Sequence, residues 1–92
     1  MDTDILINTI KDSVAGQLKL SKQQAAEFLT YLQANKAEMS AAIATGLPDQ
    51  AAVVGFRLAG WARDSAVQQI RAAEQRIFDI ATAAIGVAIA LV

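Results

Sequence analysis

The 92-residue chain contains no cysteine and no histidine. Without cysteine it has no disulfide framework and no thiolate chemistry, and without histidine it lacks the commonest metal ligand and the usual general base near neutral pH. Zinc sites built on these residues, and Ser-His-Asp or Cys-His catalytic arrangements, are therefore excluded. Asp2, Asp4 and Asp12 lack the spacing of a calcium loop. The sequence predicts no enzyme, no catalytic residue, no metal site, no cofactor and no small-molecule substrate.

The chain also lacks an excess of charge of either sign. Eight basic and nine acidic residues give a formal net charge of −1, which provides no cationic surface for phosphates, so nucleic-acid binding is not predicted. The N-terminus is acidic where a secretory signal is basic, and no long apolar run follows within the first thirty residues. We predict synthesis in the cytoplasm without a signal peptide. A final location in a viral or secretion particle, or at a membrane, is left open.

Helix breakers are few, with one proline and five glycines. The apolar residues that are present include twenty Ala beside nine Ile, eight Leu and six Val. A chain under about 100 residues buries roughly 60–65 % of the surface that its unfolded form exposes, and alanine adds little transfer free energy to that burial. We therefore expect one helical domain over residues 1–92 with a small core that benefits from a partner surface.

The spacing of apolar residues predicts an all-α fold whose first two helices are amphipathic. Leu6, Ile10 and Val14 repeat every four residues, which places the first helix at about residues 3–18. Asp2 or Thr3 is expected to cap this helix at its N-terminus.

The second helix has clear start and stop signals. Ser21 and Gln24 have the spacing of a capping box, in which each side chain satisfies a backbone N–H group at the start of a helix. Gly46 suits the left-handed position that ends a helix, and Pro48 cannot continue one. The second helix is therefore expected over about residues 22–45.

A long third helix is expected over about residues 49–92, with a kink or a helix boundary near Gly60. Continuous, it measures roughly 65 Å at 1.5 Å per residue. One seam along it is predicted to face the core: Val53, Phe56, Gly60, Arg63, Val67, Ile70, Glu74, Ile77, Ala81, Ala84, Ala88 and Leu91.

The last charged residue is Asp79, so residues 80–92 form an uncharged apolar segment. A helix that is apolar on every side must be buried in protein or in lipid. The sixteen residues from Ile77 span about 24 Å, less than the roughly 30 Å of a bilayer core. We predict burial against protein, in this chain or in neighbouring copies, with insertion of residues 77–92 into a bilayer as the alternative.

Within this segment, Thr82, Gly86 and Ala90 form a row of small residues at four-residue spacing, which lets two helix backbones approach closely. Bulkier side chains lie on the opposite side of the same helix. The predicted surface for self-association or partner binding contains both sets: Thr82, Gly86, Ala90, Ile80, Val87 and Leu91.

Aromatic residues are few, and three of them are candidate interface anchors: Phe56, Trp61 and Phe78. Arginines lie near Phe56 and Trp61, but two arginines countered by Asp64 do not make the cationic surface that nucleobase stacking requires. We expect Trp61 and Phe56 to pack together, and an anchoring role for Trp61 on a partner or at a membrane boundary is the alternative.

These features favour a non-enzymatic structural or assembly subunit. Its apolar C-terminal helix is predicted to pack with copies of itself, or into a larger multi-protein particle such as a virion, a tail or a secretion machine. One alternative is a small membrane-active protein that inserts residues 77–92 into a bilayer. The other is a small helical module that regulates or inhibits a protein target.

Overall fold

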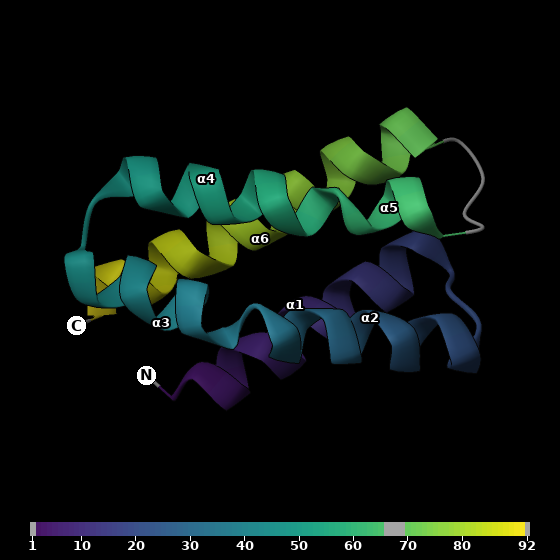
Figure 1. The fold of residues 1–92 in the computed structure, drawn as a ribbon, viewed down its shortest axis with the longest axis horizontal. Coiled ribbons are helices and arrows are strands. Elements are labelled where there is room, and N and C mark those ends of the chain that lie inside the picture. The colour runs from purple at the N-terminus through teal and green to yellow at the C-terminus, as the bar shows by residue number, and fades with distance from the viewer. Residues whose placement is uncertain (1, 66–69, 92) are drawn as a thin grey trace.

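The structure is a computed structural model that describes residues 2–65 and 70–91. Over these ranges the chain forms helices and no strand, which confirms the predicted all-α class. The helices are α1 (Thr3–Leu18), α2 (Lys22–Ala34), α3 (Lys36–Thr45), α4 (Pro48–Ala59), α5 (Trp61–Asp64) and α6 (Ile70–Leu91). They surround one core in a body of 35 × 21 × 19 Å (Figure 1).

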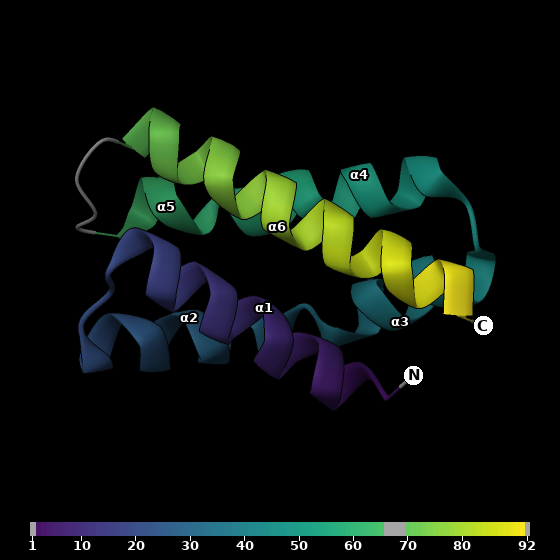
Figure 2. The same ribbon diagram turned by 180° about the vertical axis from the view of Figure 1, so that it is seen from behind.

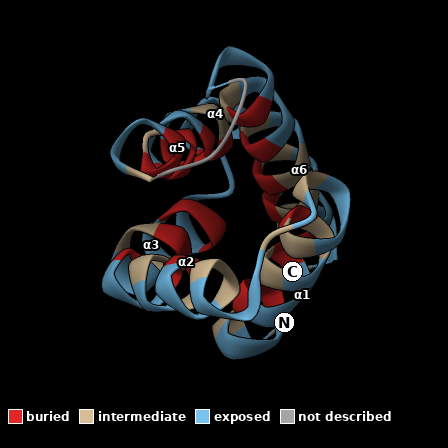
Figure 3. Cartoon of the chain, turned by 90° about the vertical axis from the view of Figure 1, so that its right-hand side faces the viewer, coloured by how far each residue is buried: buried red, intermediate tan, exposed pale blue. Residues whose placement is uncertain are grey.

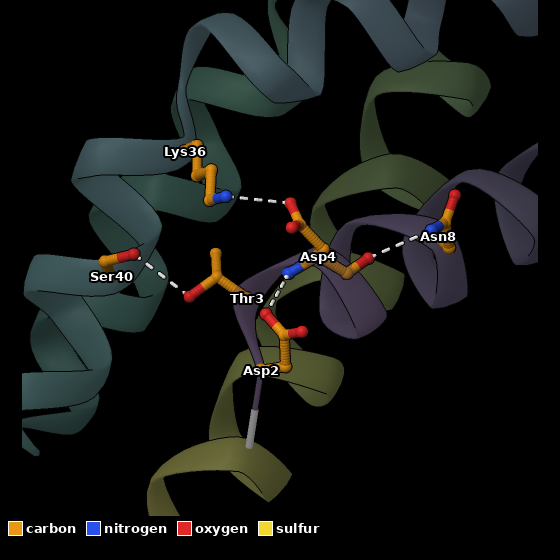
Figure 4. Close-up of polar contacts among 6 residues, drawn as sticks. All are labelled: Asp2, Thr3, Asp4, Asn8, Lys36 and Ser40. Carbon is orange, nitrogen blue, oxygen red and sulfur yellow. Dashed lines mark hydrogen bonds and ion pairs between the residues drawn. The ribbon is translucent and has the colours of Figure 1, made fainter.

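Helix α1 has the predicted bounds, and its N-terminus is tied to α3. The Asp2 carboxylate accepts a hydrogen bond from the Asp4 backbone N–H at 3.0 Å, which makes Asp2 the cap. The Lys36 ammonium lies 2.9 Å from the Asp4 carboxylate, and the hydroxyls of Thr3 and Ser40 lie 3.0 Å apart (Figure 4). The hydrogen bond that the Lys36 ammonium donates to the Asp4 carboxylate raises the pKa of Lys36 above its ordinary value. These contacts hold the start of α1 against α3.

The second predicted helix has the expected start and end but is interrupted at Asn35. The Ser21 and Gln24 capping box is present, and Gly46 ends α3 with a φ of 72°. Asn35 takes φ −104° and ψ 14°, and its side-chain amide donates to the Tyr31 carbonyl at 2.9 Å. A continuous helix over residues 22–45 is therefore wrong, because the buried Asn35 side chain competes for a helical carbonyl.

The segment expected as a long third helix is divided into α4, α5 and α6, and the boundary predicted near Gly60 is confirmed. A second break follows α5, where Ser65 has the extended values φ −113° and ψ 154°. Helix α6 then runs back antiparallel to α4 and packs on both α4 and α1. Seen from behind, it passes in front of α4 and lies beside α1 (Figure 2). The chain therefore forms a hairpin in place of a 65 Å rod, and α4 and α6 bury their apolar sides against each other.

The broken helix changes which residues face the core. The buried positions of α4 are Ala51, Val54, Gly55, Leu58 and Ala59. Val53 and Phe56, both assigned to the predicted seam, are 55 % and 67 % exposed. Ile70 and Leu91 are exposed as well, whereas the predicted Ile77, Ala81 and Ala88 are buried. Val67 lies outside the described residues. The predicted seam is wrong in α4 because it assumed one helical period from residue 53 to residue 91, whereas α4 and α6 are separate helices.

Buried faces of all the helices point toward the middle of the bundle (Figure 3). Trp61 lies in this core and is 5 % exposed. Its ring packs against Phe28 of α2, with centroids 4.8 Å apart and planes at 53°. The prediction that Trp61 packs with Phe56 is therefore wrong, because α5 turns the indole inward while α4 leaves Phe56 at the surface.

Candidate functional site

The surface of α6 depends on how closely this helix lies against α4. A Cβ atom on Gly55 would clash with the Thr82 hydroxyl and would touch the Phe78 ring at 3.4 Å. Gly55 is thus a position where the missing side chain permits two helix backbones to approach. The Thr82 hydroxyl is buried here without a hydrogen-bond partner among the described residues.

The inner side of α6 is covered by the chain itself. Ile77, Ala81, Ile85 and Ala88 are completely buried, and α6 packs on α4, α1, α3 and α5. The sequence allowed this side of α6 to be covered by the chain itself, by a neighbouring copy or by lipid, and in the structure the chain itself covers it.

The outer side of α6 changes character along its length. Its first half exposes Arg71, Gln75, Arg76 and Asp79, as an amphipathic surface helix normally does. The second half exposes no charged group. Its solvent-facing residues form what we call the uncharged outer face: Ala83, Gly86, Val87, Ala90 and Leu91. Val87 is 56 % and Leu91 67 % exposed.

The six residues predicted for self-association divide between the outer face and the interior. Gly86, Ala90, Val87 and Leu91 all belong to the uncharged outer face, so the prediction that small and bulky residues lie on opposite sides of this helix is wrong. The exposed arc of α6 is wide enough to include members of both sets. Ile80 and Thr82 are half-buried, and Ile80 packs against the core while Thr82 meets Gly55. The predicted row of small residues therefore begins in an internal helix contact and continues onto the surface.

Two predicted anchors, Phe56 and Phe78, meet in a second feature, an open groove of about 480 Å³ between α4, α5 and α6. We call it the α4–α6 groove, and it is lined by Phe56, Ala59, Arg63, Arg71, Glu74, Gln75 and Phe78. The Arg63 Nε donates to a Glu74 carboxylate oxygen at 3.0 Å across it. The third anchor, Trp61, lies in the core.

Sequence reasoning missed Ala83 as a member of the exposed surface of α6, and it missed the Arg63–Glu74 ion pair. The two partners of that pair are eleven positions apart and belong to different helices. The absence of charge after Asp79 was a usable signal for Ala83, but no local pattern indicated that α4 and α6 would form a groove.

Groups of acidic residues that could hold a metal ion are absent from residues 2–65 and 70–91. In the described part of the chain, every helix is too short or too polar to cross a bilayer. Comparisons with protein-family models, curated proteins and solved structures find no match to this chain.

Proposed function

We propose that the protein is a non-enzymatic assembly subunit that associates with further copies of itself through the uncharged outer face of α6. The observation that carries this proposal is the exposure of Val87 and Leu91 on a half-helix whose outer side has no charged residue. Burying such side chains against protein releases apolar surface from water, which favours association.

The chemistry of this face suits a second copy. The face carries no charge, so the same faces of two copies can pack together without electrostatic repulsion and without burying an unpaired charge. Gly86 adds a second reason. A Cβ atom at Gly86 would meet nothing within 4 Å, so nothing in the protomer uses the missing side chain. A glycine inside a helix lowers stability by about 0.5–1 kcal/mol relative to alanine. Close packing of a second helix against Gly86 would explain why a glycine is present at this position.

The assembly is either a closed homo-oligomer or a part of a larger particle built from many copies. Insertion of residues 77–92 into a bilayer stays an alternative proposal. It requires Ile77, Ala81 and Ile85 to leave the core, where they are completely buried. Among the described residues, no observation favours the third alternative, a regulatory or inhibitory module.

Sedimentation velocity over a concentration series tests the proposal. The full chain is expected to self-associate, and Val87→Glu is expected to return it to the monomer because a charge then has to be buried. Val53→Glu is the matched control, since Val53 is an equally exposed valine, at 55 %, on α4. Gly86→Leu is expected to act like Val87→Glu through steric overlap, with Gly16→Leu as control, because Gly16 of α1 also has open space around it.

Liposomes are added in a parallel arm. A chain that stays monomeric at every concentration in plain buffer contradicts self-association. If the full chain floats with the liposomes and the Val87→Glu variant does not, the result supports the membrane alternative instead.

A further inference from the structure

The α4–α6 groove has an aromatic end and a basic end. The Phe78 ring lies against Gly55, next in sequence to Phe56, so both rings line the same part of the groove. Arg71 lies seven residues before Phe78 on α6, which corresponds to about 10 Å along the helix axis. Arg63 of α5 closes the basic end from the other side. Between these ends the lining is Ala59 of α4 with the polar Glu74 and Gln75 of α6. About two helical turns of α6 therefore separate the apolar end, at Phe56 and Phe78, from the arginine side chains.

The charges of the lining do not balance. Arg63 is neutralised by Glu74 at 3.0 Å through its Nε, whereas Arg71 forms no ion pair with any residue in the described ranges. The lining thus carries two positive groups and one negative group. A second groove, on the α1 side of α6, differs in both respects. It contains Arg76 with Asp79, Arg76 donates to the Gln17 side chain at 3.1 Å, and no aromatic residue lines it.

We propose that the α4–α6 groove binds a small amphipathic carboxylate of medium chain length. Its apolar chain lies between Phe56 and Phe78, and its carboxylate accepts hydrogen bonds from Arg71. The volume of about 480 Å³ falls within the roughly 300–1,000 Å³ of small-ligand sites, which combine apolar and aromatic walls with a few polar groups. Arginine presents a planar fork of donors that matches a carboxylate. With carbon–carbon bonds of about 1.5 Å, a zigzag chain of roughly eight to ten carbons spans the groove.

Titration of the isotope-labelled full chain with decanoate, below its micelle concentration, tests this assignment. We expect saturable 1:1 binding, with the largest amide shifts at the residues lining the groove. Phe56→Ser and Arg71→Gln each remove one half of the site at an exposed position, and each is expected to weaken binding about tenfold. The matched controls are Val53→Ser on α4 and Arg76→Gln in the other groove, and both are expected to bind like the unchanged protein. Decanol, which has the same chain without the charge, is expected to bind about tenfold more weakly.

Several outcomes overturn the proposal. These are absence of saturable binding, equal affinity for decanol, or equal loss of affinity in Val53→Ser. If dilution without ligand moves the same amide signals, the groove is filled by another copy of the chain and the proposal fails. The titration is repeated with Val87→Glu, where unchanged affinity is expected, because this site is separate from the uncharged outer face and its success or failure does not depend on assembly.

Discussion

Gly55 of α4 lies against Thr82 of α6 so closely that a methyl group on Gly55 would overlap the Thr82 hydroxyl. The carbonyl oxygen of Phe78 lies at 3.4 Å from the same point. This pair sets the separation of the α4–α6 hairpin, on which both the groove and the outer face of α6 depend.

Gly55→Ala is expected to lower the free energy of unfolding by about 1–2 kcal/mol, because overpacking outweighs the gain in helix propensity. Thr82→Ala alone is expected to raise the free energy of unfolding by about 0.5–1 kcal/mol, since it removes a buried hydroxyl that has no hydrogen-bond partner within residues 2–65 and 70–91. The double variant is expected to recover most of the loss from Gly55→Ala. Urea denaturation of all four proteins gives the coupling, and strict additivity of the two changes contradicts the contact.

Substituting three other glycines by alanine is expected to change the free energy of unfolding, with an increase at two positions and a decrease at the third. Gly86→Ala and Gly16→Ala each raise the free energy of unfolding of the monomer by about 0.5–1 kcal/mol, because both positions are helical and have open space. Gly46→Ala lowers it by about 1 kcal/mol, because Gly46 has a φ of 72°. Denaturant titration at a protein concentration where the chain is monomeric measures these changes. A loss of stability in Gly86→Ala under these conditions argues against an open position.

Phe28 of α2 is buried and Phe56 of α4 is exposed, so truncating the two side chains is expected to have different effects on stability. Phe28→Ala is expected to cost about 3–5 kcal/mol, because Phe28 is completely buried against Trp61. Phe56→Ala is expected to stay within about 0.5 kcal/mol of the unchanged protein, since Phe56 is exposed. Thermal unfolding followed by the fluorescence of Trp61, the single tryptophan, compares the two. Equal effects at both positions contradict the assignment of α4 faces.

The capping box at the start of α2 is expected to contribute measurably to stability. Ser21→Ala lowers the free energy of unfolding by about 1 kcal/mol, because the Gln24 backbone N–H loses its bond to the Ser21 hydroxyl at 3.1 Å. Ser21→Gly, which keeps a favourable cap residue, is expected to lose a few tenths of that amount. Chemical denaturation of both variants measures the difference, and a neutral Ser21→Ala shows that the cap adds nothing.

Tyr31 links stability to alkaline pH. Burial raises the pKa of its hydroxyl above the ordinary 10.0, Arg57 opposes this rise and Asp64 adds to it. The hydroxyl also donates to the Arg57 carbonyl at 2.8 Å, a bond that ionisation abolishes. The folded chain therefore holds this proton more tightly than the unfolded chain, so the contribution of Tyr31 is intact below pH 10.0 and is lost as pH rises through its folded pKa. Because the chain has one tyrosine, ultraviolet absorbance of the phenolate reports this pKa directly.

Tyr31→Phe is the control for this titration. It is expected to remove the absorbance change and to flatten the alkaline loss of stability, at a cost of about 1 kcal/mol near neutral pH for the missing hydrogen bond. A folded pKa at or below 10.0 contradicts the role given to burial.

The interruption at Asn35 shows where sequence reasoning on helices fails. Asparagine is a weak helix former, and that was a usable signal between Ala34 and Lys36. The break itself is fixed by burial of Asn35 and by its bond to the Tyr31 carbonyl. These depend on the packing of α2 and α3 in the bundle.

The candidate surfaces were predictable to different degrees. The uncharged outer face follows from the absence of charge after Asp79, together with the helical period that separates inner from outer residues. The α4–α6 groove does not follow from any local pattern, because the chain from Phe56 to Phe78 must first turn back on itself.

Local sequence patterns specify the helical class, the caps at Ser21 and Gly46, and the lack of charge after Asp79. Each of these depends on atoms within a few residues of one another. The tertiary structure alone decided that α6 folds back on α4, that Trp61 meets Phe28 and that Phe56 faces water. Those outcomes depend on contacts between helices that are distant in sequence, such as Gly55 with Thr82, whose fit is settled when the whole core packs.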